Sequence, residues 1–143
     1  MNGYLLDANL LIALAWPNHA QHAQAHRWFA SASAKGWGTC MVTQLAFVRI
    51  SSHPAVPHHV STQEALQKLR AIVARPGHLF FGEPPEGYCT AVFSRTISNT
   101  LTHHAVTDGY LATLAALHGG KLATFDKQLT RAFGQIAELI QER

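Results

Sequence analysis

The chain has 143 residues, of which 48% are hydrophobic and 13% are charged, and its formal net charge is +3 at pH 7. This length suits one domain with a sizeable core, and the hydrophobic share excludes an intrinsically disordered chain. The short apolar blocks exclude a membrane span, and residues 1–7 lack the basic start of a secretory signal, so we expect a cytoplasmic protein.

The first half of the chain alternates short apolar runs with amphipathic stretches. Tyr4 to Leu6 is an apolar run typical of a buried strand, and Asp7 follows it directly. Pro17 ends the next helical segment because proline cannot continue a helix. In chain order, the patterns predict a strand at 4–6, helices at 9–16 and 19–33, a turn at 35–38, a strand at 39–42 and a helix that Thr43 caps.

The second half of the chain repeats this alternation. Ser61 and Glu64 form a capping box that opens a helix running to about residue 74. Asp108 opens a strongly patterned helix that Gly119 and Gly120 close. The remaining patterns predict a strand at 78–81, a loop at 82–87, a helix at 88–99, a strand at 121–125 and a short helix at 129–133. Residues 135–140 fit either an edge strand or a helix.

Strands that alternate with helices predict a single α/β domain over residues 1–143, with a mainly parallel, twisted sheet of four or five strands. Right-handed crossovers then place helices on both faces of the sheet. In such sheets the functional crevice lies beyond the carboxyl ends of the strands. The residues that follow each apolar run are therefore the first candidates for a site.

The aspartates occupy these positions. The chain has eight acidic residues, and its aspartates are Asp7 after the first strand, Asp108 at a helix start and Asp126 after the strand at 121–125. Aspartate is a favoured N-cap residue, so each of them alone is ordinary. All the aspartates of an acid-poor chain nevertheless fall on one predicted edge, which favours a shared role.

Carboxylates crowded at one edge repel one another unless a cation balances their charge. Hard oxygen ligands without a matching set of Cys or His suit Mg²⁺ or Mn²⁺. A divalent ion held by carboxylates in an open crevice orients a phosphate and lowers the pKa of the attacking water. The pattern therefore predicts a metal-dependent hydrolase acting on phosphodiester bonds, with Asp7, Asp108 and Asp126 as catalytic residues and metal ligands.

Four segments in register resemble the PIN-domain family, specifically the VapC-type toxins of bacterial toxin–antitoxin pairs. The resemblance runs from one end of the chain to the other, with the order and spacing of the motifs intact. The segments are residues 5–12, the helix with His22, Ala25, Trp28 and Phe29, residues 40–49, and the acidic motifs at 107–112 and 122–126.

The match departs from the family at one position. The second acidic residue of the family is usually a glutamate, and by register it falls on Gln44 here. A neutral amide brings no charge, so we expect at most three carboxylates around the metal and weaker metal binding. Asn9 and Gln44 are expected to hydrogen-bond the metal ligands or metal-bound water rather than to bind the metal directly, although Asn9 also fits a plain helix start.

The resemblance implies an endoribonuclease that uses Mg²⁺ or Mn²⁺ and cleaves structured RNA such as tRNA or rRNA. It also implies a cognate antitoxin protein that masks the crevice, and a homodimer, which the shortage of charged residues independently permits. Two alternatives remain open. The chain could be a catalytically weak module that binds RNA or a protein partner, which Gln44 favours, or a small phosphohydrolase.

Other residues carry weaker signals. His19, His22 and His26 share one helical face, where a polar surface is favoured over a transition-metal site. Cys40 and Cys89 fit reduced core cysteines better than a disulfide or a thiol nucleophile. The basic side chains Arg49, Arg95, Lys127 and Arg131 are candidates for contacts to an RNA backbone. The loop histidines His103 and His104 could meet phosphates, but solvated side chains are favoured there. The aromatic side chains Trp16, Trp37, Phe80 and Phe81 could stack on bases, but their apolar neighbours favour a core or an interface.

Overall fold

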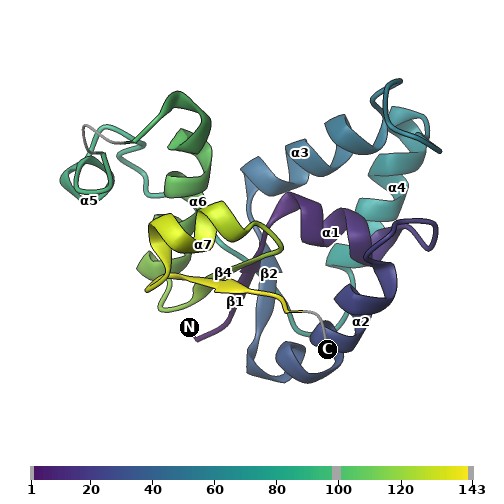
Figure 1. Ribbon diagram of the computed structural model, residues 1–143, viewed down its shortest axis with the longest axis horizontal. Helices are drawn as coiled ribbons and strands as arrows, with labels where there is room; N and C mark the ends of the chain where they lie inside the picture. The colour runs from purple at the N-terminus through teal and green to yellow at the C-terminus, as the bar shows by residue number, and fades with distance from the viewer. Residues whose placement is uncertain (1, 98–100, 142–143) are drawn as a thin grey trace.

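The computed structural model describes residues 2–97 and 101–141. Within these residues one five-stranded sheet has the strand order β3-β2-β1-β4-β5, and Figure 1 shows β1, β2 and β4 near the centre of the molecule. Every neighbouring pair is parallel, which confirms the α/β expectation. The strands are β1 (Tyr4–Leu6), β2 (Trp37–Thr39), β3 (His78–Phe80), β4 (Lys121–Thr124) and β5 (Ala137–Leu139).

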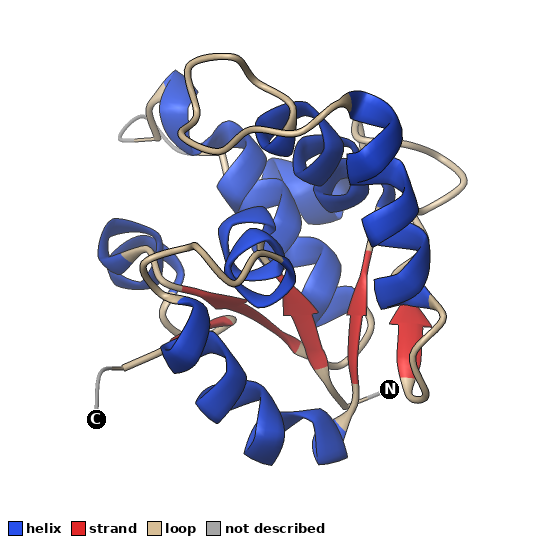
Figure 2. Ribbon diagram, turned by 90° about the vertical axis from the view of Figure 1, so that its right-hand side faces the viewer, coloured by secondary structure: helices blue, strands red, loops and turns tan. Residues whose placement is uncertain are grey.

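Helices cover both faces of this sheet, as right-handed crossovers require (Figure 2). Two short 3₁₀ helices, η1 and η2, each lie against the end of a longer helix. The helices are α1 (Ala8–Ala15), α2 (His22–Ala32), η1 (Ser33–Lys35), α3 (Met41–Ser51), α4 (Thr62–Val73), α5 (Ala91–Ser94), η2 (His103–Ala105), α6 (Val106–Leu117) and α7 (Lys127–Phe133). In the described residues none of them is both long and apolar enough to cross a bilayer.

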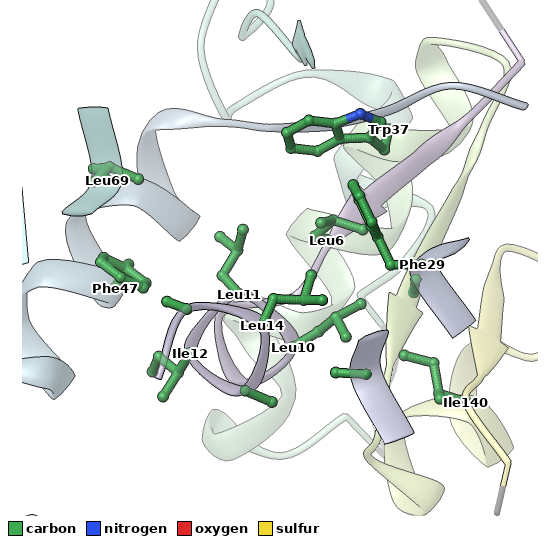
Figure 3. Close-up of a cluster of buried hydrophobic side chains, with 14 residues drawn as sticks. Leu6, Leu10, Leu11, Ile12, Leu14, Phe29, Trp37, Phe47, Leu69 and Ile140 are labelled. Carbon is green, nitrogen blue, oxygen red and sulfur yellow. The ribbon is translucent and has the colours of Figure 1, made fainter. Parts of the chain in front are cut away.

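The central strands divide their side chains between two cores, because successive strand residues point to opposite faces. Leu5 and Leu122 pack in the core that α6 and α7 cover. Leu6 and Ala123 pack in the other core, which α1 to α4 cover (Figure 3). Burial of one such leucine contributes roughly 1.5–3 kcal/mol. The two inner strands are thus held from both sides, and their carboxyl ends are firmly placed.

The segment around β2 differs from the expected turn at 35–38 and strand at 39–42. Gly36, with φ 100°, makes the turn alone, and the strand begins at Trp37. A Cβ on Gly38 would lie 1.9 Å from the carbonyl oxygen of Leu79, so this glycine is required by the approach of β3. The strand ends at Thr39, earlier than expected, because Cys40 is already the N-cap of the next helix.

The start of α3 also differs in detail. Its N-cap is Cys40, and the Thr43 side chain accepts a hydrogen bond from the Cys40 backbone N–H at 3.0 Å. Thr43 thus closes the capping box from inside the helix rather than from its first position. At α4 the expected cap is confirmed, because the Ser61 hydroxyl oxygen accepts from the Glu64 N–H at 3.1 Å.

The helix expected over 88–99 is wrong in extent, since α5 covers only Ala91–Ser94 and residues 98–100 lie outside the described part of the chain. The conformation of this segment is set by side-chain packing, because the rings of Tyr88 and Phe93 both contact Tyr110 of α6. Helix α6 begins at Val106, so Asp108 lies in its first turn and does not open it. The open choice at 135–140 is resolved as the edge strand β5.

Candidate active site

The three aspartates lie at the carboxyl side of the sheet. Asp7 follows β1 directly, and its backbone N–H donates to Ala123 of the neighbouring strand β4 at 3.0 Å. Asp126 lies two residues beyond the end of β4. Asp108 belongs to α6, which packs on the face of the sheet that Leu5 and Leu122 share. Parallel pairing of β1 with β4 is what brings together residues more than a hundred positions apart.

Asp7 is held in place on both carboxylate oxygens. It is 8% exposed, its Oδ1 accepts from the Ala8 N–H at 2.8 Å, and its Oδ2 accepts from the Thr124 hydroxyl at 2.7 Å. Burial raises the pKa of Asp7, the two hydrogen bonds oppose that rise, and the charge of Asp126 adds to it. Asp7 therefore serves as the N-cap of α1 and as the most rigidly placed acid of the three.

Thr124 hydrogen-bonds both Asp7 and Asp126, a role that the sequence pattern did not predict. Its hydroxyl donates to Asp7, and the same oxygen accepts from the Asp126 backbone N–H at 3.0 Å. The Asp126 carboxylate itself is exposed and caps α7, with Oδ1 accepting from Gln128 at 2.8 Å and Leu129 at 3.1 Å. The available signal was a buried polar residue in an otherwise apolar strand, two positions before an acid.

Of the three aspartates, Asp108 has the pKa that its surroundings shift most. Its pKa is raised to about 6, first by burial, then by the charge of Asp7, and then by the charge of Asp126. The three carboxylates are therefore close enough for each charge to be felt at Asp108. Across residues 2–97 and 101–141, however, no three Asp, Glu, His or Cys side chains already form a group that could hold a metal ion.

Gln44 and Asn9 are placed differently from each other. The Gln44 amide donates from Nε2 to the Thr39 hydroxyl at 2.9 Å, and Thr39 Oγ1 also bonds His78 Nε2 at 2.8 Å. This network orients the Gln44 side chain at the start of α3, near the carboxyl end of β2. Asn9 is exposed in the first turn of α1, two residues beyond Asp7.

The remaining candidates fall mostly into structural roles. His22 Nδ1 lies 2.7 Å from the Ala13 carbonyl oxygen and His26 Nε2 lies 3.0 Å from that of Leu14. Both rings thus satisfy carbonyl groups at the end of α1, as the polar-face interpretation expects. Trp37 and Phe81 are core residues.

The cysteines and the loop histidines complete the candidates. Both cysteines are free, as expected, but only Cys40 is buried; Cys89 is exposed, so its assignment to the core is wrong. Burial raises the pKa of the Cys40 thiol, with Glu83 adding to the shift, which disfavours a nucleophilic thiolate there. The rings of His103 and His104 in η2 lie 3.8 Å apart between centroids and are tilted by 40°, one turn before Asp108.

No family model matches the chain. It is similar to three ribonucleases of Mycobacterium tuberculosis. Ribonuclease VapC39 is 42% identical over 127 residues, which cover 87% of this chain and 89% of the relative. Ribonuclease VapC38 is 37% identical over 123 residues (85% and 84%), and ribonuclease VapC29 is 37% identical over 136 residues (95% of each). Each similarity extends over most of both chains.

Proposed function

The chain belongs to the VapC family of ribonucleases, and from this premise we propose that it is a divalent-metal-dependent endoribonuclease, the toxin of a toxin–antitoxin pair. The observation that carries the proposal is the placement of three aspartates at the carboxyl side of the sheet, where Thr124 hydrogen-bonds both Asp7 and the backbone of Asp126 and where the charges of these two acids raise the pKa of Asp108 beyond the effect of burial. The proposal places the protein in the cytoplasm, where its RNA substrate is found.

The donor set fits a hard divalent cation. Asp7, Asp108 and Asp126 offer carboxylate oxygens. Burial raises the pKa of Asp108 and the charges of Asp7 and Asp126 add to that rise, so a bound cation would favour its ionised form. A bound Mg²⁺ or Mn²⁺ would orient the scissile phosphate and lower the pKa of the attacking water. Asp7 and Asp126 also cap helices, but a carboxylate oxygen that accepts one hydrogen bond keeps a lone pair with which it can bind the ion.

Each aspartate has a different role in the proposed site. Asp7, fixed by Thr124 and the N-terminus of α1, supplies a rigid ligand. Asp108 supplies the carboxylate whose ionisation gains most from a bound cation. Asp126, the most exposed, is a third ligand or orients the attacking water. Asn9 and Gln44 act on these groups from the second layer of residues.

The proposed substrates are structured RNAs such as tRNA or rRNA, cut at a single-stranded loop, and the proposed partners are an antitoxin protein and a second copy of the chain. Support for a protein partner comes from large apolar side chains that the fold leaves exposed. Met41 is 47% exposed and Leu45 63% exposed on α3, and Leu66 on α4 is 41% exposed. Exposed apolar patches of this kind mark interaction surfaces.

Purified protein incubated with labelled total RNA tests the function. We expect cleavage with Mg²⁺ or Mn²⁺, and loss of cleavage when EDTA removes the ion. Retention of RNA without cleavage would instead support the catalytically weak binding module, for which Gln44 is the specific evidence. Hydrolysis of phosphate monoesters in place of RNA would identify a small phosphohydrolase.

Gln44→Glu is expected to lower the metal concentration needed for half-maximal cleavage, by about tenfold. The substitution adds a fourth carboxylate where the family usually has one. A carboxylate cannot donate to Thr39, but the Thr39 hydroxyl can donate to it while His78 donates to Thr39, so the network survives with its direction reversed. The measurement is a Mg²⁺ or Mn²⁺ titration of cleavage rate.

The matched control for this titration is Gln63→Glu, the same change at an exposed position in the first turn of α4. It adds the same charge away from the site and should leave the metal dependence unchanged. An unaltered or higher half-saturating concentration in the Gln44 variant would contradict a place for Gln44 beside the metal.

A further inference from the structure

Two adjoining cavities lie between α2 and the last segment of the chain. The larger has a volume of about 490 Å³ and the smaller about 280 Å³. Both are lined by Gln24, Leu139 and Gln141, so they form one continuous depression, here called the α2–β5 groove. Figure 1 shows the yellow end of the chain, with β5, running toward α2, and Ile140 packs in the same core as Phe29 of α2 (Figure 3).

The groove extends from the candidate active site toward the opposite edge of the sheet. Lys127, which lines the smaller cavity, is the residue next to Asp126. Lys35, which lines the larger cavity, lies just before β2, at the amino ends of the strands. The two ends are therefore separated by at least the length of the four-residue strand β4, roughly 13 Å at about 3.3 Å per residue.

The lining of the groove has the chemistry of a polyanion site. Arg27, Lys35 and Lys127 are exposed cations along it. The carboxylate in the groove, Glu138, is engaged by the Tyr4 hydroxyl, which donates to it at 3.3 Å. Among the lining residues that the structure describes, the cations therefore outnumber the acid, and long basic side chains spaced along a depression are what a phosphate backbone requires.

Glutamine side chains add a second kind of contact. Gln21 lines the smaller cavity, and Gln24 and Gln141 line both cavities. An amide offers a donor and an acceptor at once, which suits base edges and ribose hydroxyls. An extended peptide added to a sheet edge would instead require alternating side-chain pockets. The composition favours a nucleic acid over a protein.

We propose that the α2–β5 groove binds the single-stranded RNA that flanks the scissile bond, with Arg27, Lys35 and Lys127 contacting successive phosphates. This inference rests on the proposed ribonuclease function. Three carboxylates at the cleavage site repel RNA, so affinity has to come from cations outside it. At about 3.4 Å per stacked nucleotide, a groove of roughly 13 Å holds about four nucleotides.

The test measures binding of a fluorescein-labelled, 12-nucleotide single-stranded RNA of mixed sequence by anisotropy, in EDTA to prevent cleavage, from 50 to 300 mM KCl. Arg27→Gln and Lys35→Gln are each expected to reduce the slope of log affinity against log salt by about 0.7, the value for one phosphate contact on a single strand. The double variant should bind about tenfold or more weakly at 100 mM KCl. Arg70→Gln, an exposed arginine on α4, is the matched control and should leave the slope unchanged.

The outcomes separate this inference from the function on which it rests. Suppose that the wild type cleaves RNA with metal but that both groove variants have the same salt slope as the wild type. This result would overturn the proposal that the groove binds RNA, without affecting the ribonuclease proposal, and would favour a protein as the occupant of the groove. Absence of RNA cleavage by the wild type with Mg²⁺ and with Mn²⁺ overturns the ribonuclease proposal. Slopes that fall in the groove variants and not in Arg70→Gln support the RNA path.

Discussion

Asp108→Asn is expected to lower the rate of metal-dependent RNA cleavage about 100- to 1,000-fold at pH 7. The change preserves the size of the side chain and removes its charge. With a pKa of about 6, Asp108 is mostly ionised at pH 7, so the wild type presents this carboxylate to a cation and the variant presents a weak neutral ligand. Initial rates on labelled RNA at saturating Mg²⁺ or Mn²⁺ give the measurement.

The thermal stability of the Asp108→Asn variant should depend on pH differently from that of the wild type. The pKa of Asp108 is raised from 3.8 in the reference state to about 6 in the folded protein, so the folded state binds the proton more tightly. Its contribution to stability is complete below about pH 4 and is lost as the pH rises through 6. Asparagine carries no charge at any of these pH values, so the variant does not lose this stability as the pH rises.

Metal-free Asp108→Asn should therefore melt above the metal-free wild type at pH 7, and the gap should close toward pH 4. Because Asp108 is only partly buried, solvent screens much of the repulsion, and we expect a gain of about 3 °C. Thermal melts in EDTA at the two pH values measure it. A fully folded, more stable and inactive variant would separate loss of chemistry from loss of structure.

Glu64→Gln provides the matched control for activity, since Glu64 is also an acid in the first turn of a helix but lies exposed on α4. It should cleave RNA at the wild-type rate. An Asp108 variant that retains cleavage within about threefold of the wild type, in clean protein, would remove Asp108 from the proposed mechanism.

The parallel sheet and the placement of the acids could be predicted because local and tertiary requirements coincide there. The apolar run at Tyr4 to Leu6 is buried on both faces, as a central parallel strand must be. Asp7 and Asp126 follow such strands and cap the next helices. One local signal, an acid after an apolar run, thus reports both a cap and a position at the edge of the sheet.

Features that depend on distant partners could not be predicted in this way. The role of Thr124 arises only when β4 pairs with β1 and brings its hydroxyl to Asp7. The short α5 is set by rings that pack on Tyr110. Gly38 was interpreted as part of a turn because glycine is common in turns. Its actual cause, the approach of β3, is invisible in the local pattern.

Gly38→Ala is expected to destabilise the protein by more than about 3 kcal/mol. The new Cβ would lie 1.9 Å from the Leu79 carbonyl oxygen and 2.7 Å from the Leu79 carbonyl carbon, and 3.0 Å from Cε1 of Phe81. The first two are backbone atoms in the strand that pairs with β2, so they cannot move without breaking the ladder. Phe81 is fully buried, so its displacement disturbs the core as well.

Gly82→Ala separates this clash from the general effect of replacing glycine. A Cβ at Gly82 meets no atom within 4 Å, so this variant should unfold within about 0.5 kcal/mol of the wild type, or slightly later because alanine restricts the unfolded chain. Urea unfolding followed by circular dichroism compares the three proteins. If Gly38→Ala unfolds like Gly82→Ala, β2 and β3 do not approach as closely as the register Gly38 to Leu79 requires. The placement of Thr39, and with it the hydrogen bond that orients Gln44, would then have to be revised.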